Sequence, residues 1–330
     1  MPLKLGILST AWINERAIFR VTPGIEGLKV LAVASRSETT AAAYSRRHAI
    51  ARFYDSYDRL LEDSELDAVY ISLPNSLHVE WTSRALARGK HVLCEKPFSA
   101  EPERVLALEE LAATRGLCLM EAMHYRYHPA VRQAVDAVHA GAIGSLEKVS
   151  VVFEGDSHRE DDIRFQAELE GGALMDAGCY CLDLIRWVTG DDEPAVLAAD
   201  AEWSNTRVDL MTTGTLLCSG NVPATFCCTL NAKAFNCYAK ITGTLGSLEL
   251  HYPFLPVAGT PEAPQVLFAC LKDKTPIVEN VPLESSYFYQ LEVFKNRIES
   301  GTAKTLKKVD RPYYNAALLA KVRELRESKS

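Results

Sequence analysis

The chain opens on the stretch Leu3-Lys4-Leu5-Gly6-Ile7-Leu8-Ser9-Thr10-Ala11-Trp12-Ile13. The mostly apolar stretch 3–8 is typical of a buried strand, and the small residues after it favour a tight turn into a helix. The same alternation recurs through the first 120 residues. We expect strands at 3–8, 28–34, 68–73, 91–94 and 117–120, separated by helices at 13–21, 38–48, 57–63, 78–88 and 103–115. This order predicts a Rossmann-type α/β domain with a doubly wound parallel sheet.

The pattern changes after residue 120. A helix at 129–140, a strand at 146–153 and a helix at 173–189 precede a series of strands joined by short turns. These strands are expected at 196–203, 209–218, 222–231, 234–242, 246–252 and 265–271. Sequential strands of this kind predict a C-terminal α+β domain with a large, mostly antiparallel open sheet. Two helices follow at 286–300 and 312–328. We expect domains at 1–122 and 123–311, and the sequence leaves open whether the helix at 312–328 packs back on the first domain.

Composition narrows the function classes. The 330 residues carry 36 Lys+Arg against 43 Asp+Glu, for a net charge of −7, and 48% are hydrophobic. An acidic chain without a basic run argues against nucleic acid as a partner. No run of 18 apolar residues predicts a membrane span, and the start does not read as a signal peptide. We therefore expect a cytoplasmic protein with no membrane partner.

The nine cysteines are scattered and lie mostly in apolar stretches. They are interpreted as reduced, buried thiols. Cys179-x-Cys181 lacks the spacing of a zinc site, so no structural metal is expected.

A doubly wound sheet binds its ligand at the carboxyl ends of its strands. After the first strand the chain reads Gly6-x-x-Ser9-x-Ala11. Small residues let backbone N–H groups approach a pyrophosphate, whereas the alternative is a tight turn with no ligand. Trp12 either covers the nicotinamide or packs the first helix. The candidate cofactor residues of this turn are Gly6, Ser9, Thr10, Ala11, Trp12 and Ile13.

The second strand ends in Ser35 and Arg36, where an NAD-binding protein usually has an acidic residue. A hydroxyl and a guanidinium suit a 2′-phosphate, which indicates NADP. Glu38 keeps NAD possible. The alternative is that Ser35 caps the next helix and Arg36 is solvated.

The third strand ends in Leu73-Pro74-Asn75-Ser76-Leu77-His78 and the fourth in Cys94-Glu95-Lys96-Pro97. Read in isolation, Pro74 and Pro97 are chain terminators, and Glu95-Lys96 is a surface ion pair. The register nevertheless puts Lys96 at the strand end where a nicotinamide ring would lie. The candidate cofactor residues here are Leu73, Asn75, His78, Glu95 and Lys96.

These segments together resemble the Gfo/Idh/MocA family of NAD(P)-dependent sugar and polyol oxidoreductases. The matching segments are the turn at 6–13, Leu73-Pro74-Asn75-x-x-His78, Glu95-Lys96-Pro97, Tyr125-Arg126-Tyr127-His128-Pro129 and Gly171-Gly172-Ala173-Leu174-Met175-Asp176-x-x-x-Tyr180. They keep the family's order over about the first 190 residues. The Tyr180 position is similar to the branch with dihydrodiol dehydrogenases, D-xylose 1-dehydrogenases and ketosugar reductases. Ser9 and Ala11 depart from the family by replacing glycines.

Asp176 and Tyr180 are spaced i, i+4, so a helix places them one turn apart. Without the resemblance, the pair would be interpreted as a half-buried Tyr180 beside a solvated Asp176. The resemblance implies that Lys96, Asp176 and Tyr180 meet over the nicotinamide. Tyr180 is then the proton donor in reduction and the acceptor in oxidation, and the Lys96 ammonium lowers the pKa of Tyr180 and holds the substrate oxygen.

The substrate-binding candidates are His124, Tyr125, Asp176 and Tyr180. Arg164 is either a cofactor or substrate ligand or a charged residue of a surface loop. His128, just before Pro129, is expected to be a structural residue at a helix start.

We therefore expect an NADP-dependent oxidoreductase that interconverts a hydroxyl and a carbonyl on a sugar, a cyclic polyol or a related small diol. A nucleotide-binding sensor on the same fold is the main alternative, since fold alone does not imply catalysis. A hydrolase that uses the nicotinamide transiently is a further one. The open sheet suggests a homodimer or tetramer formed through the C-terminal domain.

Overall fold

The computed structural model describes residues 2–157, 162–254, 265–270, 284–301 and 308–327. The described chain divides into two compact units. The first unit contains residues 1–99, 103–123 and 287–306, and the second contains 100–102, 124–286 and 307–330. Each unit has its own sheet and is described by itself.

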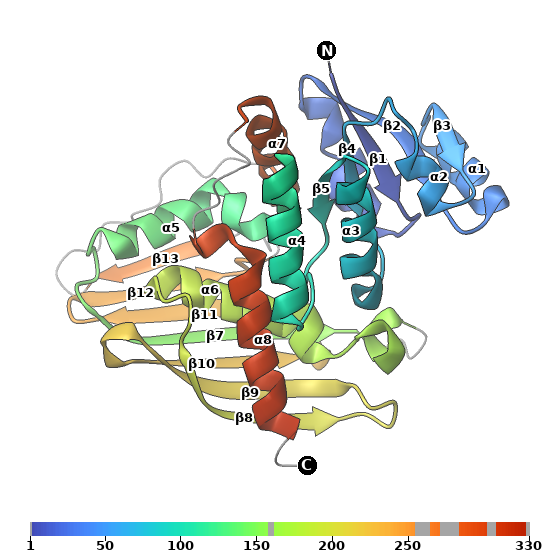
Figure 1. The fold of residues 1–330 in the computed structure, drawn as a ribbon. Helices are drawn as coiled ribbons and strands as arrows, with labels where there is room; N and C mark the ends of the chain where they lie inside the picture. Colours follow the sequence, from blue (N-terminus) through green and yellow to red (C-terminus); the bar gives the residue numbers. More distant parts are fainter. Residues whose placement is uncertain (1, 158–161, 255–264, 271–283, 302–307, 328–330) are drawn as a thin grey trace. The chain divides into compact units, whose positions relative to one another are not determined.

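The first unit is built on a six-stranded parallel sheet (Figure 1). Its strands are β1 (Leu3–Leu8), β2 (Leu28–Ala34), β3 (Arg52–Tyr54), β4 (Ala68–Ile71), β5 (His91–Cys94) and β6 (Leu119–Glu121). The order β3-β2-β1-β4-β5-β6 is that of a Rossmann fold and confirms the expected fold class. Because both faces of a parallel sheet are covered, the central strands are almost wholly apolar, and Leu5, Ile7 and Val69 have no exposed surface.

Helices and short turns connect these strands. The α-helices are α1 (Glu38–Arg47), α2 (Tyr57–Leu61), α3 (His78–Ala87), α4 (Pro102–Arg115) and α7 (Ser286–Glu299). A five-residue π-helix, Glu15–Phe19, occupies the expected first helix, and 3₁₀ turns lie at Thr22–Gly24 and Asn75–Leu77. The strand β3 was not expected. It has only three residues, all of them at least partly exposed, so it lacks the apolar run that marks the other strands.

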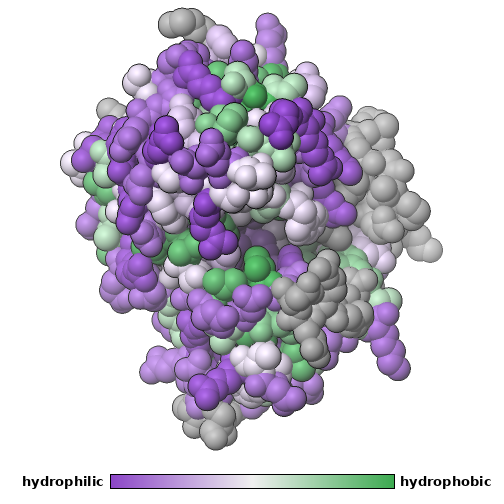
Figure 2. Space-filling model, turned by 90° about the vertical axis from the view of Figure 1, so that its right-hand side faces the viewer, coloured by the Kyte–Doolittle hydropathy of each residue, from purple (hydrophilic) through white to green (hydrophobic). Residues whose placement is uncertain are grey.

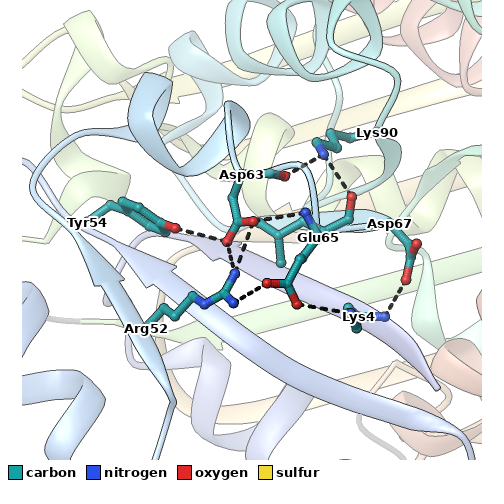
Figure 3. Close-up of polar contacts among 8 residues, drawn as sticks. Lys4, Arg52, Tyr54, Asp63, Glu65, Asp67 and Lys90 are labelled. Carbon is teal, nitrogen blue, oxygen red and sulfur yellow. Dashed lines mark hydrogen bonds and ion pairs between the residues drawn. The ribbon is translucent and has the colours of Figure 1, made fainter. Parts of the chain in front are cut away.

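Charged residues gather at the amino ends of the first sheet's strands (Figure 3). Arg52, which begins β3, donates to the Asp63 carboxylate at 2.9 and 3.1 Å and also binds Glu65. Lys4 of β1 reaches Glu65 at 3.1 Å. Lys90, just before β5, donates to the carbonyl oxygens of Asp63 and Leu66 at 2.7 and 2.8 Å. We call these residues the amino-edge network, together with Asp67 and with Tyr54, which ends β3 and reaches Asp63 with its hydroxyl.

Asp63 is the centre of the amino-edge network. Its carboxylate accepts hydrogen bonds from Arg52, from the Tyr54 hydroxyl at 2.9 Å and from the Glu65 N–H at 2.9 Å. Burial acts to raise the pKa of Asp63, but these hydrogen bonds outweigh it and hold the pKa below its ordinary value. The network therefore joins strands at this edge through groups that satisfy one another.

The second unit contains a seven-stranded sheet. Its strands are β7 (Leu146–Asp156), β8 (Ala195–Trp203), β9 (Asp209–Cys218), β10 (Val222–Thr229), β11 (Asn231–Gly243), β12 (Gly246–His251) and β13 (Gln265–Cys270). The order is β13-β12-β11-β7-β10-β9-β8, and β7 pairs parallel with β10, whereas the other pairs are antiparallel. This is the mostly antiparallel sheet that the sequence predicted.

Three helices cover one face of this sheet: α5 (Pro129–His139), α6 (Cys179–Thr189) and α8 (Pro312–Glu327) (Figure 1). A π-helix, Leu174–Gly178, leads directly into α6. Short 3₁₀ turns lie at His124–Tyr127, Ile163–Phe165, Ala167–Leu169, Ser219–Asn221 and Lys308–Asp310. His128 is the N-cap of α5, because its Nδ1 accepts from the Ala130 N–H at 3.3 Å, as its expected structural role requires.

The two late helices divide between the units. From Tyr287 onward, α7 belongs to the first unit, whereas α8 belongs to the second. Arg326 of α8 forms a buried ion pair with Asp209 of β9 at 2.7 Å. The last helix therefore packs within the second unit, and the segment that returns to the first unit is α7. The chain leaves the first unit after Ser99, returns to it at Glu103 and leaves it again after Met123.

Hydrophilic residues predominate on the face drawn in Figure 2, and hydrophobic residues form small groups there. Cys94, Cys118, Cys179, Cys181, Cys218, Cys228 and Cys237 are buried free thiols, as expected for small apolar residues, and Cys227 is a half-buried one. Among the described helices, none is long and apolar enough to cross a membrane.

Candidate functional site

The turn after β1 is held by side chains rather than by glycines. Ser9 has φ 133°, in the region that favours glycine. Its buried hydroxyl donates to the Ser72 carbonyl at 2.9 Å and accepts from the Ala11 N–H at 3.0 Å. Asn14 donates to the Ser9 carbonyl at 3.1 Å and accepts from the Ser72 hydroxyl at 2.7 Å. This network explains how a serine fits at a position where a glycine is usual.

The other candidates of this turn differ in exposure. Gly6 lies inside β1, and a Cβ there would come within 2.8 Å of Leu66 and 2.9 Å of Leu60. Its missing side chain is therefore required by packing against α2 and the loop after it. Thr10, Ala11 and Ile13 are half-buried, whereas Trp12 is 57% exposed, with the Arg16 guanidinium 5.2 Å from the centre of its ring.

The end of β2 carries an exposed cation. Ser37, not Ser35, is the N-cap of α1, since the Ser37 hydroxyl accepts from the Thr40 N–H at 3.3 Å. Ser35 is buried at the strand end, and Arg36 is exposed. Burial raises the pKa of the Tyr57 phenol, and the hydrogen-bonded Arg36 guanidinium acts against that rise. Because its partner Tyr57 is a neutral phenol, the Arg36 guanidinium can still bind an anion.

The ends of β4 and β5 are tied together by His78. This imidazole has no exposed surface, and its Nδ1 and Nε2 lie 2.8 Å from the carbonyl oxygens of Pro97 and Leu73 respectively. Burial lowers the pKa of His78, and the Lys96 charge lowers it further. Lys96 is half-buried and lies two residues beyond the end of β5. The contacts of His78 thus fix the backbone on which Lys96 stands.

Two neighbouring candidates have contacts that the sequence did not reveal. The Tyr70 hydroxyl, inside β4, donates to the Glu95 carboxylate. Asn75 is half-buried and begins the 3₁₀ turn Asn75–Leu77, which leads into α3. Leu73 is buried at the start of this segment. All of these residues lie at the carboxyl edge of the first sheet, as their positions in the sequence predict.

In the second unit, two glycines let the backbone approach its neighbours before α6. A Cβ on Gly171 would lie 2.4 Å from the carbonyl oxygen of Arg164. Gly172 has φ 108°, and a Cβ there would lie 2.1 Å from Asp209. The backbone at these glycines therefore approaches the Ile163–Phe165 turn and the start of β9.

Asp176 and Tyr180 follow on a helix whose first turn is wide. Asp176 lies in the π-helix Leu174–Gly178, and Tyr180 is the second residue of α6. Single π-turns inside helices occur frequently at functional sites. Arg164 donates to Asp176 at 2.8 Å and to Asp162 at 3.1 Å, and Asp176, followed by Asp162, raises the pKa of Arg164. Arg164 is therefore bound to the candidate carboxylate itself.

Tyr180 is enclosed by aromatic rings and contacts a histidine. Its side chain is 6% exposed, and the rings of Phe153 and Phe254 lie 5.8 and 5.3 Å away between centroids. Its hydroxyl lies 3.1 Å from Nε2 of His124, whose Nδ1 lies 2.7 Å from the Ser286 hydroxyl. The sequence predicted both Tyr180 and His124, and the structure brings them into direct contact.

A buried ion pair holds the turn that carries His124. The Tyr125 hydroxyl donates to Asp183 of α6 at 2.6 Å, and Arg126 binds the same carboxylate. Tyr125 has no exposed surface, and burial, with the Asp183 charge, raises its pKa well above the ordinary value. Tyr125 thus has a packing role in the structure, because it fixes the turn His124–Tyr127 against α6.

Sequence reasoning missed Asp209, Asp183 and Ser286. Asp209 accepts from the Leu174 N–H and from Arg326, each at 2.7 Å, so it fixes the start of the helix that carries Asp176 and Tyr180. Each of the three residues meets partners far along the chain, and no local motif marks such contacts. Gly172 gave the only local signal, since it has to approach some surface.

Comparison with known proteins supports the two-unit organisation. The profile of an oxidoreductase family with an NAD-binding Rossmann fold matches residues 4–123, and that of the GFO/IDH/MocA C-terminal domain matches residues 131–249. The chain belongs to the GFO/IDH/MocA oxidoreductase family. The resemblance that the motifs suggested is therefore confirmed, and the protein is an enzyme of the oxidoreductase class.

Similar members of the family act on sugars and diols. The chain is 33% identical over 303 residues to D-xylose 1-dehydrogenase (NADP(+)) 2 of Haloferax volcanii, covering 91% of this chain and 90% of the relative. It is 33% identical over 258 residues to trans-1,2-dihydrobenzene-1,2-diol dehydrogenase of Bos taurus, covering 77% and 75%. The fold matches the crystal structure of KijD10, a 3-ketoreductase from Actinomadura kijaniata in complex with NADP and TDP-benzene. That match has a TM-score of 0.90 and 27% identity and covers 99% and 98% of the two chains.

Proposed function

We propose that this protein is an NADP-dependent oxidoreductase that interconverts a hydroxyl and a carbonyl on a sugar, a cyclic polyol or a related small diol. The observation that carries the proposal is the presence of both family domains in one chain, each with its ionisable candidate. Lys96 lies beyond β5 in the first unit, and Tyr180 lies in α6 in the second. The named activities of the relatives support this substrate class.

The first unit has a donor set that fits NADP. The strand order reverses between β1 and β4, which is where such sheets bind a dinucleotide. Arg36, exposed at the end of β2, would hold the 2′-phosphate, with Ser35 beside it. The turn 10–13 would hold the pyrophosphate with backbone N–H groups, and the carboxyl-edge residues Leu73, Asn75 and Glu95 would line the nicotinamide half. In this proposal His78 acts by fixing their backbone.

When bound, the cofactor supplies or accepts the hydride, and the protein has to manage the proton. We assign Tyr180 as the proton donor to the substrate oxygen in reduction and as the acceptor in oxidation. A phenol in apolar surroundings resists ionisation, because burial disfavours the charged form. A nearby ammonium counteracts this effect, so we assign Lys96 to stabilise the developing negative charge and to hold the substrate oxygen.

Asp176 is proposed to accept a hydrogen bond from a substrate hydroxyl. Its carboxylate already binds Arg164 at 2.8 Å, and both side chains are about one-quarter exposed. An ion pair with remaining exposed surface can offer a donor and an acceptor to a polyhydroxylated molecule. This supports a sugar or polyol substrate, with Arg164 on the substrate or cofactor side and His124 acting next to Tyr180.

We also propose that the protein works in the cytoplasm as a homodimer or tetramer. The described helices α5, α6 and α8 lie on one face of the second sheet, and residues of the other face are partly exposed. A half-exposed sheet face is suited to pairing with a second copy. Sedimentation velocity measures the oligomeric state directly, and a monomer at micromolar concentration would contradict the proposed dimer or tetramer.

The experiment that tests the function is a fluorescence titration of the protein with NADPH and NADH, followed by assays with a panel of aldoses, ketosugars, inositols and diketones. The proposal predicts tighter binding of NADPH and its oxidation with at least one panel member. Binding without turnover by any member would favour a sensor. No binding of either nucleotide would contradict the proposal.

A further inference from the structure

Three residues of the second unit form a hydrogen-bonded chain that ends at the proposed proton donor. Tyr180 Oη lies 3.1 Å from His124 Nε2, and His124 Nδ1 lies 2.7 Å from Ser286 Oγ. The side chains come from α6, from the turn that follows β6 and from the first residue of α7. Their exposed fractions are 6%, 2% and 0% respectively. A buried polar chain drawn from three distant segments requires the fold to hold all three in place.

The surroundings of this chain favour proton transfer over simple packing. The Tyr180 ring is flanked by Phe153 and Phe254, so a phenolate formed there lacks the solvation of water. A base in direct contact with the hydroxyl can take the phenolic proton and thereby lower the cost of each transfer. A base oriented by a third group is also the arrangement by which enzymes activate hydroxyl nucleophiles.

Two charged groups beside this chain, Arg126 and Asp183, are paired with each other. Within the turn His124–Tyr127, the Tyr125 hydroxyl and the Arg126 guanidinium both bind Asp183 of α6. Arg186, one turn further along α6, lies 3.7 Å from the same carboxylate. Asp183 therefore anchors the turn, while His124 faces the hydroxyls of Tyr180 and Ser286. The titratable group on α6 that contacts the imidazole is Tyr180.

Resting on the proposed function, we infer that His124 exchanges the catalytic proton with Tyr180 and that Ser286 holds His124 in the required tautomer. Ser286 accepts from Nδ1–H, which leaves the Nε2 lone pair to accept from the Tyr180 hydroxyl. His124 acts through Tyr180, and Ser286 acts through His124. Both are therefore positioning residues.

The proton balance follows from this tautomer. In oxidation, the substrate O–H bond breaks and its proton bonds to Tyr180 Oη. At the same time the Tyr180 O–H bond breaks and its proton bonds to His124 Nε2, which becomes an imidazolium. The substrate C–H bond breaks, and its electron pair leaves as the hydride that the oxidised cofactor accepts. The imidazolium returns its proton to water between turnovers. Reduction runs in reverse.

The kinetic test uses His124→Gln, which keeps polar atoms near Nε2 but cannot take up a proton. We expect kcat to fall about ten- to one-hundredfold, while the Kd for NADPH stays within twofold. His139→Gln is the matched control, because His139 lies in the same unit with Nε2 on the carbonyl oxygen of Trp187. Its kcat is expected to remain that of the wild type. Equal kcat values for both variants would overturn the inference.

Chemical rescue separates proton transfer from packing. Substituted imidazoles added to His124→Ala are expected to restore kcat to a degree that follows their pKa. Rescue that follows only their size, or no rescue by any of them, would overturn the inference. Ser286→Ala is expected to lower kcat about tenfold, and Ser286→Thr, which keeps the hydroxyl, to recover most of it.

A second readout needs neither cofactor nor turnover. Nitrogen-15 NMR of the protein alone reports which ring nitrogen of His124 carries the proton, and the signal is assigned by its loss in His124→Gln. We expect the Nδ1–H tautomer in the wild type and a mixed population in Ser286→Ala. An Nε2–H tautomer in the wild type would overturn the inference. NADPH oxidation by the wild type tests the proposed function separately, so failure of one remains distinguishable from failure of the other.

Discussion

The two edges of the first sheet use polar residues in opposite ways. At the amino edge, Arg52, Lys4 and Lys90 are bound to Asp63, Glu65 and main-chain carbonyls (Figure 3). At the carboxyl edge, Arg36 and Trp12 are exposed, and the buried polar groups Ser9 and His78 hold backbone turns in place. The amino edge uses its charged side chains to hold the fold together, whereas Arg36 at the carboxyl edge is exposed. Residue type alone does not tell the two edges apart, since both are rich in Lys and Arg.

The largest effect expected from this contrast concerns the two lysines. Lys96→Met is predicted to lower kcat/KM about a hundredfold or more, because it removes the charge that stabilises the developing oxyanion. Lys4→Met, at the amino edge, removes an ion pair with Glu65 in which the Lys4 side chain is 30% exposed. It is expected to leave kcat/KM within twofold of the wild type. Similar losses in both variants would show that the edges do not differ in function.

The next effect concerns cofactor choice. Arg36→Ala is predicted to raise the Kd for NADPH about ten- to one-hundredfold, because a charge-assisted hydrogen bond to the 2′-phosphate is lost. The Kd for NADH is expected to stay within threefold. Arg59→Ala is the control, since Arg59 is an exposed arginine of α2 that is paired with Asp55. An equal loss for NADPH and NADH would refute the assignment of Arg36.

The amino edge is predicted to affect stability without affecting chemistry. Asp63→Asn weakens the hydrogen bonds from Arg52 and Tyr54 and is expected to lower the free energy of unfolding by about 1–2 kcal/mol. Because the pKa of Asp63 is held below its ordinary value, its contribution is present near neutral pH and is lost as the pH falls through that lowered pKa. Urea denaturation at pH 7 and pH 3 measures both effects. Unchanged stability, or a changed Kd for NADPH, would contradict this division.

The smallest effect concerns His128 of the second unit. Burial lowers the pKa of His128 to about 4, so the unfolded chain binds a proton before the native one does. The contribution of His128 to stability is therefore fully present above about pH 6.5, and it declines as the pH falls toward 4. His128→Asn keeps an N-cap residue and is expected to change stability at pH 7 by at most about 0.5 kcal/mol, while removing part of this acid loss. If the stability of His128→Asn depended on pH in the same way as that of the wild type, this prediction would be refuted.

The strands of both sheets could be predicted from the sequence, except for the short strand β3 of the first unit. The parallel strands read as apolar runs because both faces of the sheet are covered, and the strand ends then located Lys96 and Arg36. The π-turn at Leu174–Gly178 could not be predicted, since no residue pattern distinguishes it from α-helix. Nor could the partition of α7 and α8, because both have apolar faces and the choice depends on tertiary contacts such as Arg326 with Asp209.

The candidate site shows the same limit. Tyr180 and His124 were found from motifs, but their mutual contact was not, because 56 residues separate them. Ser286, 162 residues from His124, lies in no motif and was missed. Local patterns thus indicated the candidate side chains. The groups that orient these side chains became visible only in the fold.

We propose that Tyr180 transfers the proton, whereas the first unit binds the cofactor independently of it. The most direct test is rapid mixing of Tyr180→Phe with a substrate found in the panel at saturating NADPH, with the Kd for NADPH measured on the same sample. We predict that hydride transfer in Tyr180→Phe is about a hundredfold slower than in the wild type. Its Kd for NADPH is expected to stay within threefold of the wild-type value. Hydride transfer at the wild-type rate in Tyr180→Phe would contradict it.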